Sequence, residues 1–250
     1  MSSGKAQVSP DRFDAVLFDL DGVITNTAKL HATCWKQAFD EFLKKQAEET
    51  GEDFKPFDLK ADYEDYVDGK PRYDGAKSFL ESRHIDLPYG DPDDPPGKET
   101  VCGVANRKNE IFNQKLKSEG VEVFQGTVDW IHQLRGNGIK TAVVSSSKHC
   151  QAIIETAKLA DQFDARVDGK VSDELNLKGK PAPDTYLKAA EMVKAEPKRA
   201  VVVEDALAGV ESGKNGGFGM VIGVDRKGDA DALREHGATV VVRDLKEMLS

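Results

Sequence analysis

The chain has 250 residues, of which 44 are acidic and 35 basic, giving a formal charge of −9 at pH 7. This balance argues against a general nucleic-acid-binding protein, which needs a basic face. The length suits one large or two small domains. No apolar run approaches the roughly 20 residues of a membrane span, and the first residues lack the apolar core of a signal peptide. We therefore expect a cytoplasmic protein with neither a nucleic-acid nor a membrane partner.

The three cysteines, Cys34, Cys102 and Cys150, have no metal-binding spacing and are odd in number. No cysteine–histidine signature accompanies them, so a catalytic cysteine is only the alternative. We interpret all three as reduced, structural thiols.

The first apolar run, Phe13–Phe18, is short, partly β-branched or aromatic, and is followed by two acids, Asp19 and Asp21. These features predict a buried strand of a parallel sheet, and open α/β sheets bind ligands at the C-terminal ends of their strands. Two acids one residue apart on a strand point to opposite faces, but a turn at Gly22 lets both flank one pocket. One carboxylate can then act as nucleophile and the other as general acid and base, with Mg2+ beside a phosphate. The alternative is an ordinary acidic turn, since so short a motif recurs by chance.

Residues 28–120 are predicted to form a helical block. Its first helix has an apolar stripe at i, i+4 spacing, from Leu30 to Phe42, and a charged opposite side. A stretch dense in Pro, Asp and Gly predicts an irregular loop over Asp86–Gly97. The predicted helices of this block are Thr27–Glu48, Asp62–Val67, Tyr73–Arg83 and Val101–Glu119.

From Val121 onward, strands and helices alternate along the chain. The predicted strands are Ile139–Ser145, Arg199–Glu204, Gly219–Val224 and Thr239–Val242, and the predicted helices are Thr127–Arg135, Lys148–Leu159, Asp184–Lys194, Ala206–Gly213 and Ala230–His236. This alternation predicts an α/β fold: a doubly wound, Rossmann-like parallel sheet with helices on both faces. The helical block interrupts the pattern, so we expect an inserted α-helical cap domain. The expected division is a tail over residues 1–10, a core over 11–27 and 121–250, and a cap over 28–120.

Three further segments carry reactive side chains. Ser145 and Ser146 follow a predicted strand and can cradle a phosphate; a plain helix cap is the alternative. Lys180 lies in a loop bounded by prolines and can neutralise a phosphate; a solvated lysine is the alternative. Glu204 and Asp205 follow a predicted strand and suit a hard metal ion; an acidic helix N-cap is the alternative. Because all the signals are expected at the C-terminal ends of parallel strands, we favour one shared phosphate and metal site.

Together, Asp19-Leu20-Asp21-Gly22-Val23, Ser145, Lys180 and Glu204-Asp205 resemble the four motifs of the haloacid dehalogenase-like superfamily of phosphotransferases. The resemblance covers nearly the whole chain after Pro10. It implies that Asp19 is a nucleophile forming an aspartyl-phosphate and that Asp21 is the general acid and base. The implied Mg2+ ligands are Asp19, Asp21 through its backbone carbonyl, Glu204 and Asp205. The implied phosphate-binding residues are Ser145, Ser146, Lys180 and Thr27, with a role at the hinge as the alternative for Thr27.

Within the superfamily, the opening motif, which runs on to His31, is most similar to the sugar-phosphate mutases. This resemblance implies that His31 couples closure of the cap to the acid/base aspartate. It also implies that a loop from Gly69 to Arg72 grips the distal phosphate, since a guanidinium binds phosphate bidentately. Lys108 and Asn109 are implied to contact the sugar phosphate. The alternative for each is an ordinary surface residue of the cap.

We therefore expect a Mg2+-dependent enzyme that transfers a phosphoryl group through Asp19. As a mutase, it would isomerise a sugar monophosphate and use a sugar bisphosphate as activator. As a phosphatase, the alternative, it would hydrolyse a small phosphorylated metabolite; a catalytically silent ligand-binding module is a further alternative. Asn26, His149 and the long cap loops depart from the mutase pattern and leave the sugar open. The expected partner is a small phosphorylated sugar or metabolite, bound by a monomer.

Overall fold

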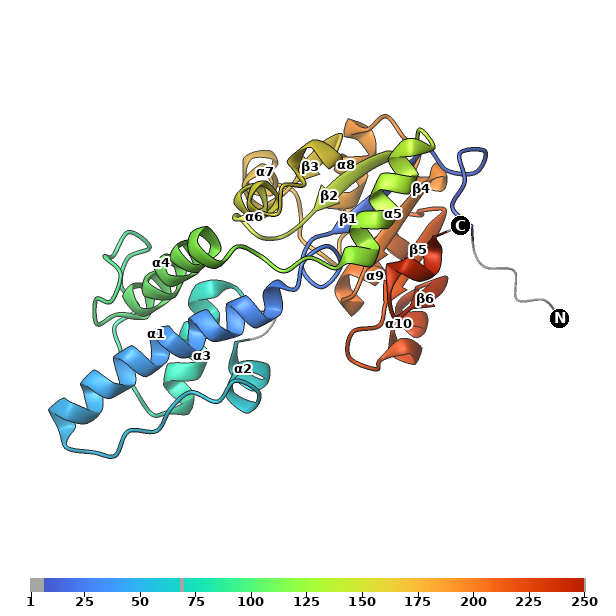
Figure 1. The fold of residues 1–250 in the computed structure, drawn as a ribbon. Coiled ribbons are helices and arrows are strands. Elements are labelled where there is room, and N and C mark those ends of the chain that lie inside the picture. The colour runs from blue at the N-terminus through green and yellow to red at the C-terminus, as the bar shows by residue number, and fades with distance from the viewer. Residues whose placement is uncertain (1–6, 68–69, 250) are drawn as a thin grey trace. The chain divides into compact units, whose positions relative to one another are not determined.

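The computed structural model describes residues 7–67 and 70–249. It divides into two compact units. One, the core, comprises the chain up to Thr27 and from Val121 onward; the other, the cap, comprises Ala28–Gly120. Figure 1 labels the elements of both units.

The core is built on a six-stranded sheet with the order β3-β2-β1-β4-β5-β6 (Figure 1). Every neighbouring pair of strands is parallel, so the predicted doubly wound parallel sheet is confirmed. The strands are β1 (Ala15–Asp19), β2 (Lys140–Val144), β3 (Ala165–Val167), β4 (Ala200–Glu204), β5 (Met220–Val224) and β6 (Val240–Val242). The core helices are α5 (Gln125–Gly136), α6 (Cys150–Thr156), α7 (Gly169–Leu175), α8 (Asp184–Met192), α9 (Leu207–Asn215) and α10 (Ala230–His236), with 3-10 turns at Ala160–Gln162, Pro197–Arg199 and Leu245–Met248.

Helices cover both faces of β1, which is buried along its whole length. On one face, Leu17 joins an apolar cluster that includes Tyr186 of α8 and Val210 of α9. On the other, the ring of Phe18 meets Trp130 of α5 edge to face, with ring centroids 5.6 Å apart. The apolar residues of the first predicted strand are thus explained by two helical layers around a central strand.

The direction of the strand order reverses at β1, with β2 and β3 on one side and β4 to β6 on the other. Such a reversal opens a crevice at the C-terminal ends of the strands, where doubly wound proteins bind ligands. Asp19 is paired in register with Val144, and Phe18 with Val203. Ser145 and Glu204, the next residues along their chains, therefore reach the same sheet edge as Asp19.

Some core elements differ from the prediction. β3 has three residues and α7 has seven, too few for a clear hydrophobic period, and neither was predicted. Because α7 and its following loop precede Lys180, this lysine does not stand at the end of a strand, and that expectation is wrong. The predicted helix Lys148–Leu159 is also shorter, since α6 begins at Cys150.

The cap consists of α1 (Thr27–Thr50), α2 (Ala61–Tyr66), α3 (Arg72–Ser82) and α4 (Val101–Glu119). Its interior contains a cluster of aromatic rings: the ring of Phe39 lies 4.1 Å from that of Phe79 and 5.2 Å from that of Phe57, measured between centroids. The predicted helices of this block are confirmed to within a few residues. Asp86–Gly97 contains no helix or strand, as its composition predicted.

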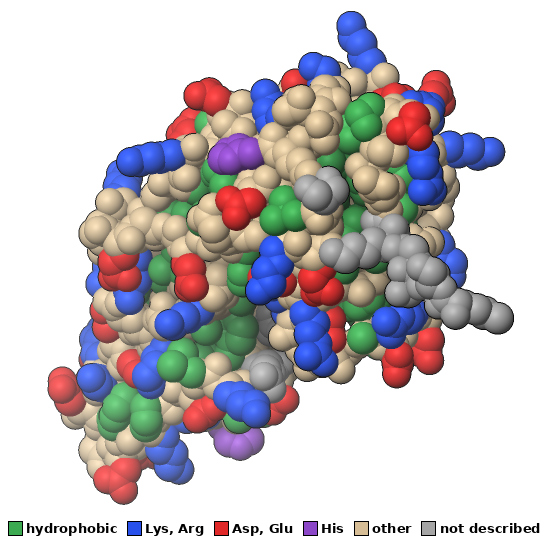
Figure 2. All heavy atoms as spheres, turned by 45° about the vertical axis from the view of Figure 1, so that its right-hand side comes forward, with side chains coloured by type: hydrophobic (Ala, Val, Ile, Leu, Met, Phe, Trp, Pro, Cys, Tyr) green, Lys and Arg blue, Asp and Glu red, His purple; other side chains and the backbone are tan. Residues whose placement is uncertain are grey.

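The surface shown in Figure 2 carries acidic and basic side chains in mixture. Among the described residues, no helix is both long enough and apolar enough to cross a membrane. The three cysteines are buried and free, and burial raises the pKa of each thiol. These properties agree with the interpretation of the cysteines as structural thiols.

Candidate active site

A tight turn follows Asp19 and directs the chain back over the end of β1. The carbonyl oxygen of Leu20 accepts the N–H groups of Ile24 and Thr25, both at 2.9 Å, and Gly22 donates to the carbonyl of Thr25 at 2.8 Å. Gly22 has a φ of +83°, which an L side chain rarely adopts. A Cβ at this position would also lie 1.9 Å from Oδ2 of Asp205. The turn therefore needs glycine both for its conformation and for its close packing against Asp205.

Asp21 is held by a hydroxyl at the start of α1. The Oγ1 of Thr27, a fully buried residue, donates to Oδ1 of Asp21. Thr27 also lies 3.3 Å from the hydroxyl of Thr25, measured between oxygens. The structure thus places Thr27 beside the acid/base candidate; its contact with a phosphate stays a prediction.

Lys180 joins the nucleophile candidate to the end of β4. Its Nζ contacts Oδ1 of Asp19 and lies 2.6 Å from Oε1 of Glu204, and its side chain is 12% exposed. The ammonium also lies over the ring of Tyr186, 5.0 Å from the centroid. Burial alone lowers the pKa of Lys180, but the two carboxylates outweigh it and hold that pKa well above its ordinary value. The alternative of a solvated lysine is therefore wrong.

Glu204 is fixed by four donors. Oε1 accepts from Lys180 and from the hydroxyl of Tyr186, 2.9 Å away, and Oε2 accepts from the backbone N–H groups of Asp205 and Ala206 at 3.1 and 3.2 Å. The carboxylate also packs against the first turn of α9, where a Cβ on Gly209 would lie 1.8 Å from Oε1. Glu204 is 1% exposed, and this hydrogen-bond network fixes the position of its carboxylate.

The acids at this edge can hold a divalent cation. Carboxylate oxygens of Asp19, Glu204 and Asp205 all lie within 4.8 Å of one another. Burial raises the pKa of Asp19 well above its ordinary value, although Lys180 opposes this, and burial with the charge of Glu204 raises the pKa of Asp205 to about 7. A nearby cation would favour the ionised carboxylates that burial disfavours, and the all-oxygen donor set fits Mg2+. The implied ligation by the backbone carbonyl of Asp21 stays a prediction.

The serine loop is organised by its own hydroxyls. Ser145 is 2% exposed, and its Oγ accepts the N–H of Ser147 at 3.1 Å. Ser146 is exposed, and α6 begins only at Cys150, so neither serine is the N-cap of that helix. The helix-cap alternative is thus wrong, and phosphate binding by Ser145 and Ser146 stays a prediction.

Sequence reasoning missed two residues of this edge, Tyr186 and Arg226. Tyr186 is a buried helical aromatic, which predicts only core packing. Arg226 follows β5; its Nε donates to the carbonyl of Gly22 at 2.7 Å, and its guanidinium stacks on Phe124, 3.6 Å from the ring centroid. No local pattern in the sequence distinguishes either residue from its neighbours.

In the cap, the structure brings His31 and Lys108 together. Nδ1 of His31 lies 2.8 Å from Nζ of Lys108, and the imidazole stacks on Phe112 with centroids 4.6 Å apart. Lys108 is 6% exposed, and its ammonium lies 5.2 Å from the ring centroids of both Trp35 and Phe112. A buried cation among aromatic faces is oriented by cation–π attraction.

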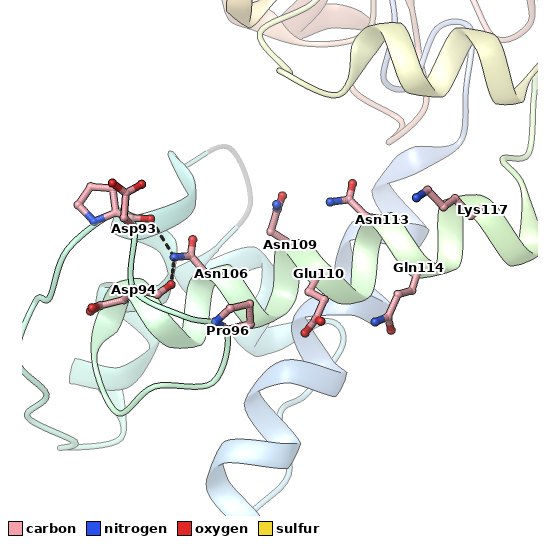
Figure 3. A pocket seen from close by; sticks show the side chains of 10 residues that line it. Asp93, Asp94, Pro96, Asn106, Asn109, Glu110, Asn113, Gln114 and Lys117 are labelled. Carbon is pink, nitrogen blue, oxygen red and sulfur yellow. Dashed lines mark hydrogen bonds between the residues drawn. The ribbon is translucent and has the colours of Figure 1, made fainter.

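The other described cap candidates are Arg72 and Asn109. Arg72 begins α3, and its Nη2 donates to the hydroxyl of Tyr73 at 2.7 Å. Asn109 of α4 lines a cavity of about 360 Å³, bordered by the loop that carries Asp93 and Asp94 (Figure 3). Gly69 lies outside the described residues.

Comparison with known proteins identifies the class. Residues 13–217 match the model of the haloacid dehalogenase-like hydrolase family, and the chain belongs to that family. The predictions of this family and of an enzyme are confirmed.

Particular relatives extend this result. A β-phosphoglucomutase of Mycobacterium tuberculosis is 48% identical over 243 residues, which cover 96% of this chain and 93% of the relative. A phosphorylated carbohydrates phosphatase of Thermotoga maritima is 27% identical over 249 residues, 94% of this chain and 100% of the relative. The crystal structure of a family hydrolase from Deinococcus radiodurans, with bound phosphate and sodium, has a TM-score of 0.69 and 27% identity, covering 95% of this chain and 93% of that one.

Proposed function

We propose that the chain isomerises β-glucose 1-phosphate to glucose 6-phosphate through the 1,6-bisphosphate, the activity of a β-phosphoglucomutase. The observation that carries the proposal is the ion pair of Asp19 with Lys180 at the sheet edge, beside the acids Glu204 and Asp205. A carboxylate nucleophile next to a buried cation suits phosphoryl transfer. The similarity to the Mycobacterium tuberculosis β-phosphoglucomutase supports the choice of sugar.

The reaction begins with a phosphoryl group on Asp19. The 6-hydroxyl of the sugar attacks the phosphorus, its proton passes to Asp21, and the bond to the Asp19 oxygen breaks. The bisphosphate then presents its other end, and Asp19 attacks the phosphorus at C1. The leaving oxygen takes the proton from Asp21, which releases glucose 6-phosphate and restores the phosphorylated Asp19. Thr27 supports this role of Asp21, because its hydrogen bond orients the carboxylate.

Charge neutralisation comes from both a side chain and a metal ion. Asp19, Glu204 and Asp205, with the carbonyl of Asp21, would hold Mg2+, which supplies positive charge to the transferring phosphoryl group. Lys180 contributes a second positive charge, and Ser145 and Ser146 are proposed to bind the phosphoryl oxygens. The substrate phosphates add further negative charge, and these cations offset the electrostatic repulsion between the phosphates and the carboxylates of the site.

The cap residues are proposed to select a substrate with two phosphates. Arg72, with the loop from Gly69, binds the phosphate that is not reacting, and Lys108 and Asn109 contact the sugar phosphate. His31, in contact with Lys108, links closure of the cap to the acid/base step. A sugar bisphosphate then serves as activator, because it phosphorylates Asp19 before the first turnover. We further propose a cytoplasmic monomer.

The product formed tests the proposal. Enzyme with β-glucose 1-phosphate, Mg2+ and a trace of bisphosphate should yield mainly glucose 6-phosphate, and excess EDTA should abolish its formation. Asp19→Asn should form neither product. The second candidate is a phosphatase, which the Thermotoga maritima relative favours by its name. Dominant release of free phosphate by the wild-type enzyme would establish that candidate instead.

A further inference from the structure

The irregular loop Asp86–Gly97 is ordered by one buried carboxylate. Oδ2 of Asp94 accepts the N–H of Asp91 at 3.1 Å and the hydroxyl of Thr100 at 2.7 Å, and Oδ1 pairs with Lys98. Thr100 is also the N-cap of α4. The loop is therefore tied to the start of a helix, although it has no secondary structure of its own.

Asn106, one and a half turns into α4, ties the loop to that helix a second time. Its Nδ2 donates to the carbonyl oxygens of Pro92 and Asp94, at 3.0 and 2.8 Å, as the dashed lines in Figure 3 show. With both amide hydrogens engaged, the amide plane is fixed. Its Oδ1 then faces a third element, α3, through the hydroxyl of Tyr73 at 3.2 Å.

Tyr73, held by Asn106, contacts the guanidinium of Arg72. The tyrosine hydroxyl has one proton, for which Asn106 Oδ1 and the Pro92 carbonyl, 3.3 Å away, are the acceptors. Its oxygen accepts from Nη2 of Arg72, and the Tyr73 ring lies under the guanidinium, 4.7 Å from centroid to Cζ. A bidentate phosphate contact uses two of the five N–H groups of arginine, and the tyrosine uses one, so both contacts are compatible.

We propose that the loop Asp86–Gly97, acting through Asn106 and Tyr73, is a positioning device for the guanidinium of Arg72. It fixes the plane in which Arg72 binds the phosphate that a sugar bisphosphate carries away from Asp19. An arginine already held in this plane loses less rotamer freedom on binding than a mobile one. Asn106 and Tyr73 are thus positioning residues, and this inference rests on the proposed function for the identity of the ligand.

A measurement on the free enzyme tests the positioning without any reaction. The Nε–Hε signal of Arg72 is assigned by its disappearance in Arg72→Lys, and its heteronuclear NOE reports side-chain order. Asn106→Ala and Tyr73→Phe should both lower this NOE. Asn113→Ala, two turns along α4 on the same cavity, is the matched control and should leave it unchanged. An NOE that Asn106→Ala and Tyr73→Phe leave at the wild-type value would overturn the proposal.

Kinetic measurements test whether the fixed orientation of Arg72 contributes to substrate binding. Tyr73→Phe keeps the ring and should raise KM for β-glucose 1-phosphate roughly 3- to 10-fold, as expected for one lost hydrogen bond. Phosphorylation of Asp19 by acetyl phosphate, which has no second phosphate, should change far less. In an Arg72→Ala background, Tyr73→Phe should have no further effect on KM. An equal effect in both backgrounds would show that Tyr73 acts elsewhere and overturn the proposal. A wild-type enzyme that forms no glucose 6-phosphate would instead contradict the proposed function, and the NOE would still decide the positioning.

Discussion

Arg226 donates from its Nε to the carbonyl oxygen of Gly22, 2.7 Å away. Gly22 follows the acid Asp21 and packs against Asp205, so this bond braces the turn that carries the reactive acids. The guanidinium is itself held from two sides, since it stacks on Phe124 and its Nη1 donates to the carbonyl of Arg243 at 3.2 Å. The brace depends on the planar, forked shape of arginine as much as on its charge.

We expect Arg226→Lys to weaken the core although it keeps the positive charge. Lysine cannot reproduce the Nε bond and the ring stack together, so the free energy of unfolding should fall by about 1–2 kcal/mol. Urea unfolding measures this change. Arg234→Lys, an exposed and ion-paired arginine of α10, is the control and should cost far less. Equal stability of Arg226→Lys and the wild type would show that the brace contributes nothing.

Gly22→Ala should damage the metal site specifically. The new Cβ would collide with the carboxylate of Asp205, so we expect the Mg2+ concentration for half-maximal activity to rise about 10- to 100-fold, as when a ligand loses its support. Gly217→Ala is the matched control, because Gly217 also has a positive φ, +68°, but a Cβ added there would have no other atom within 4 Å. It should cost about 1–2 kcal/mol of backbone strain and leave the Mg2+ requirement unchanged. Similar Mg2+ requirements in both variants would contradict the close packing of Gly22 on Asp205.

Arg72→Ala separates a mutase from a phosphatase. Loss of a charge-assisted bidentate contact should reduce sugar-phosphate isomerisation about 100-fold, or about 3 kcal/mol, in kcat as well as KM. Phosphorylation of Asp19 by acetyl phosphate should fall far less. Lys77→Ala removes an exposed cation of the same helix and should affect neither reaction. If both reactions fell equally in Arg72→Ala, the arginine would act on folding; if neither fell, the phosphatase would be the better account.

Asp94 makes the stability of the cap depend on pH. Hydrogen bonds from Lys98, Thr100 and the Asp91 backbone lower the pKa of Asp94 from 3.8 to about 2. A carboxylate with a lowered pKa stabilises the folded state fully above its ordinary pKa, and this contribution is lost as the pH falls through the lowered value. The difference in the free energy of unfolding between the wild type and Asp94→Asn should therefore be constant above pH 3.8 and shrink towards pH 2. Urea midpoints of both proteins over that range measure it, with Asp93→Asn as an exposed control; a difference that does not shrink would contradict the assignment.

Much of the fold follows from local patterns, and the exceptions have a common cause. Phe13–Phe18 predicted β1 because an apolar run that ends in acids suits a central parallel strand. β3 was missed because three residues cannot show a hydrophobic period. The position of Lys180 after α7 was therefore missed as well. The charge of Lys180 and the resemblance to the family's motifs nevertheless indicated that Lys180 and Asp19, 161 residues apart, act together, and the structure brings them into contact.

The supporting residues were not predictable from the sequence. Tyr186 and Arg226 resemble an ordinary core aromatic and an ordinary loop arginine until packing places them beside Glu204 and Gly22. The same holds for Asn106. Its proposed positioning role depends on contacts with Tyr73 and with the loop Asp86–Gly97, which no local sequence pattern indicates. Residues that act through tertiary contacts leave no periodic or motif signature.

The fate of a labelled phosphate tests the central claim most directly. Enzyme carrying an unlabelled phosphoryl group on Asp19 is mixed with an equimolar amount of β-glucose 1-phosphate whose phosphate is labelled, and the reaction is quenched in acid after one turnover. The proposed function predicts unlabelled glucose 6-phosphate and a labelled protein, with the label on the peptide that contains Asp19 and absent from Asp19→Asn. Label recovered as free phosphate, or on glucose 6-phosphate within that first turnover, would contradict it.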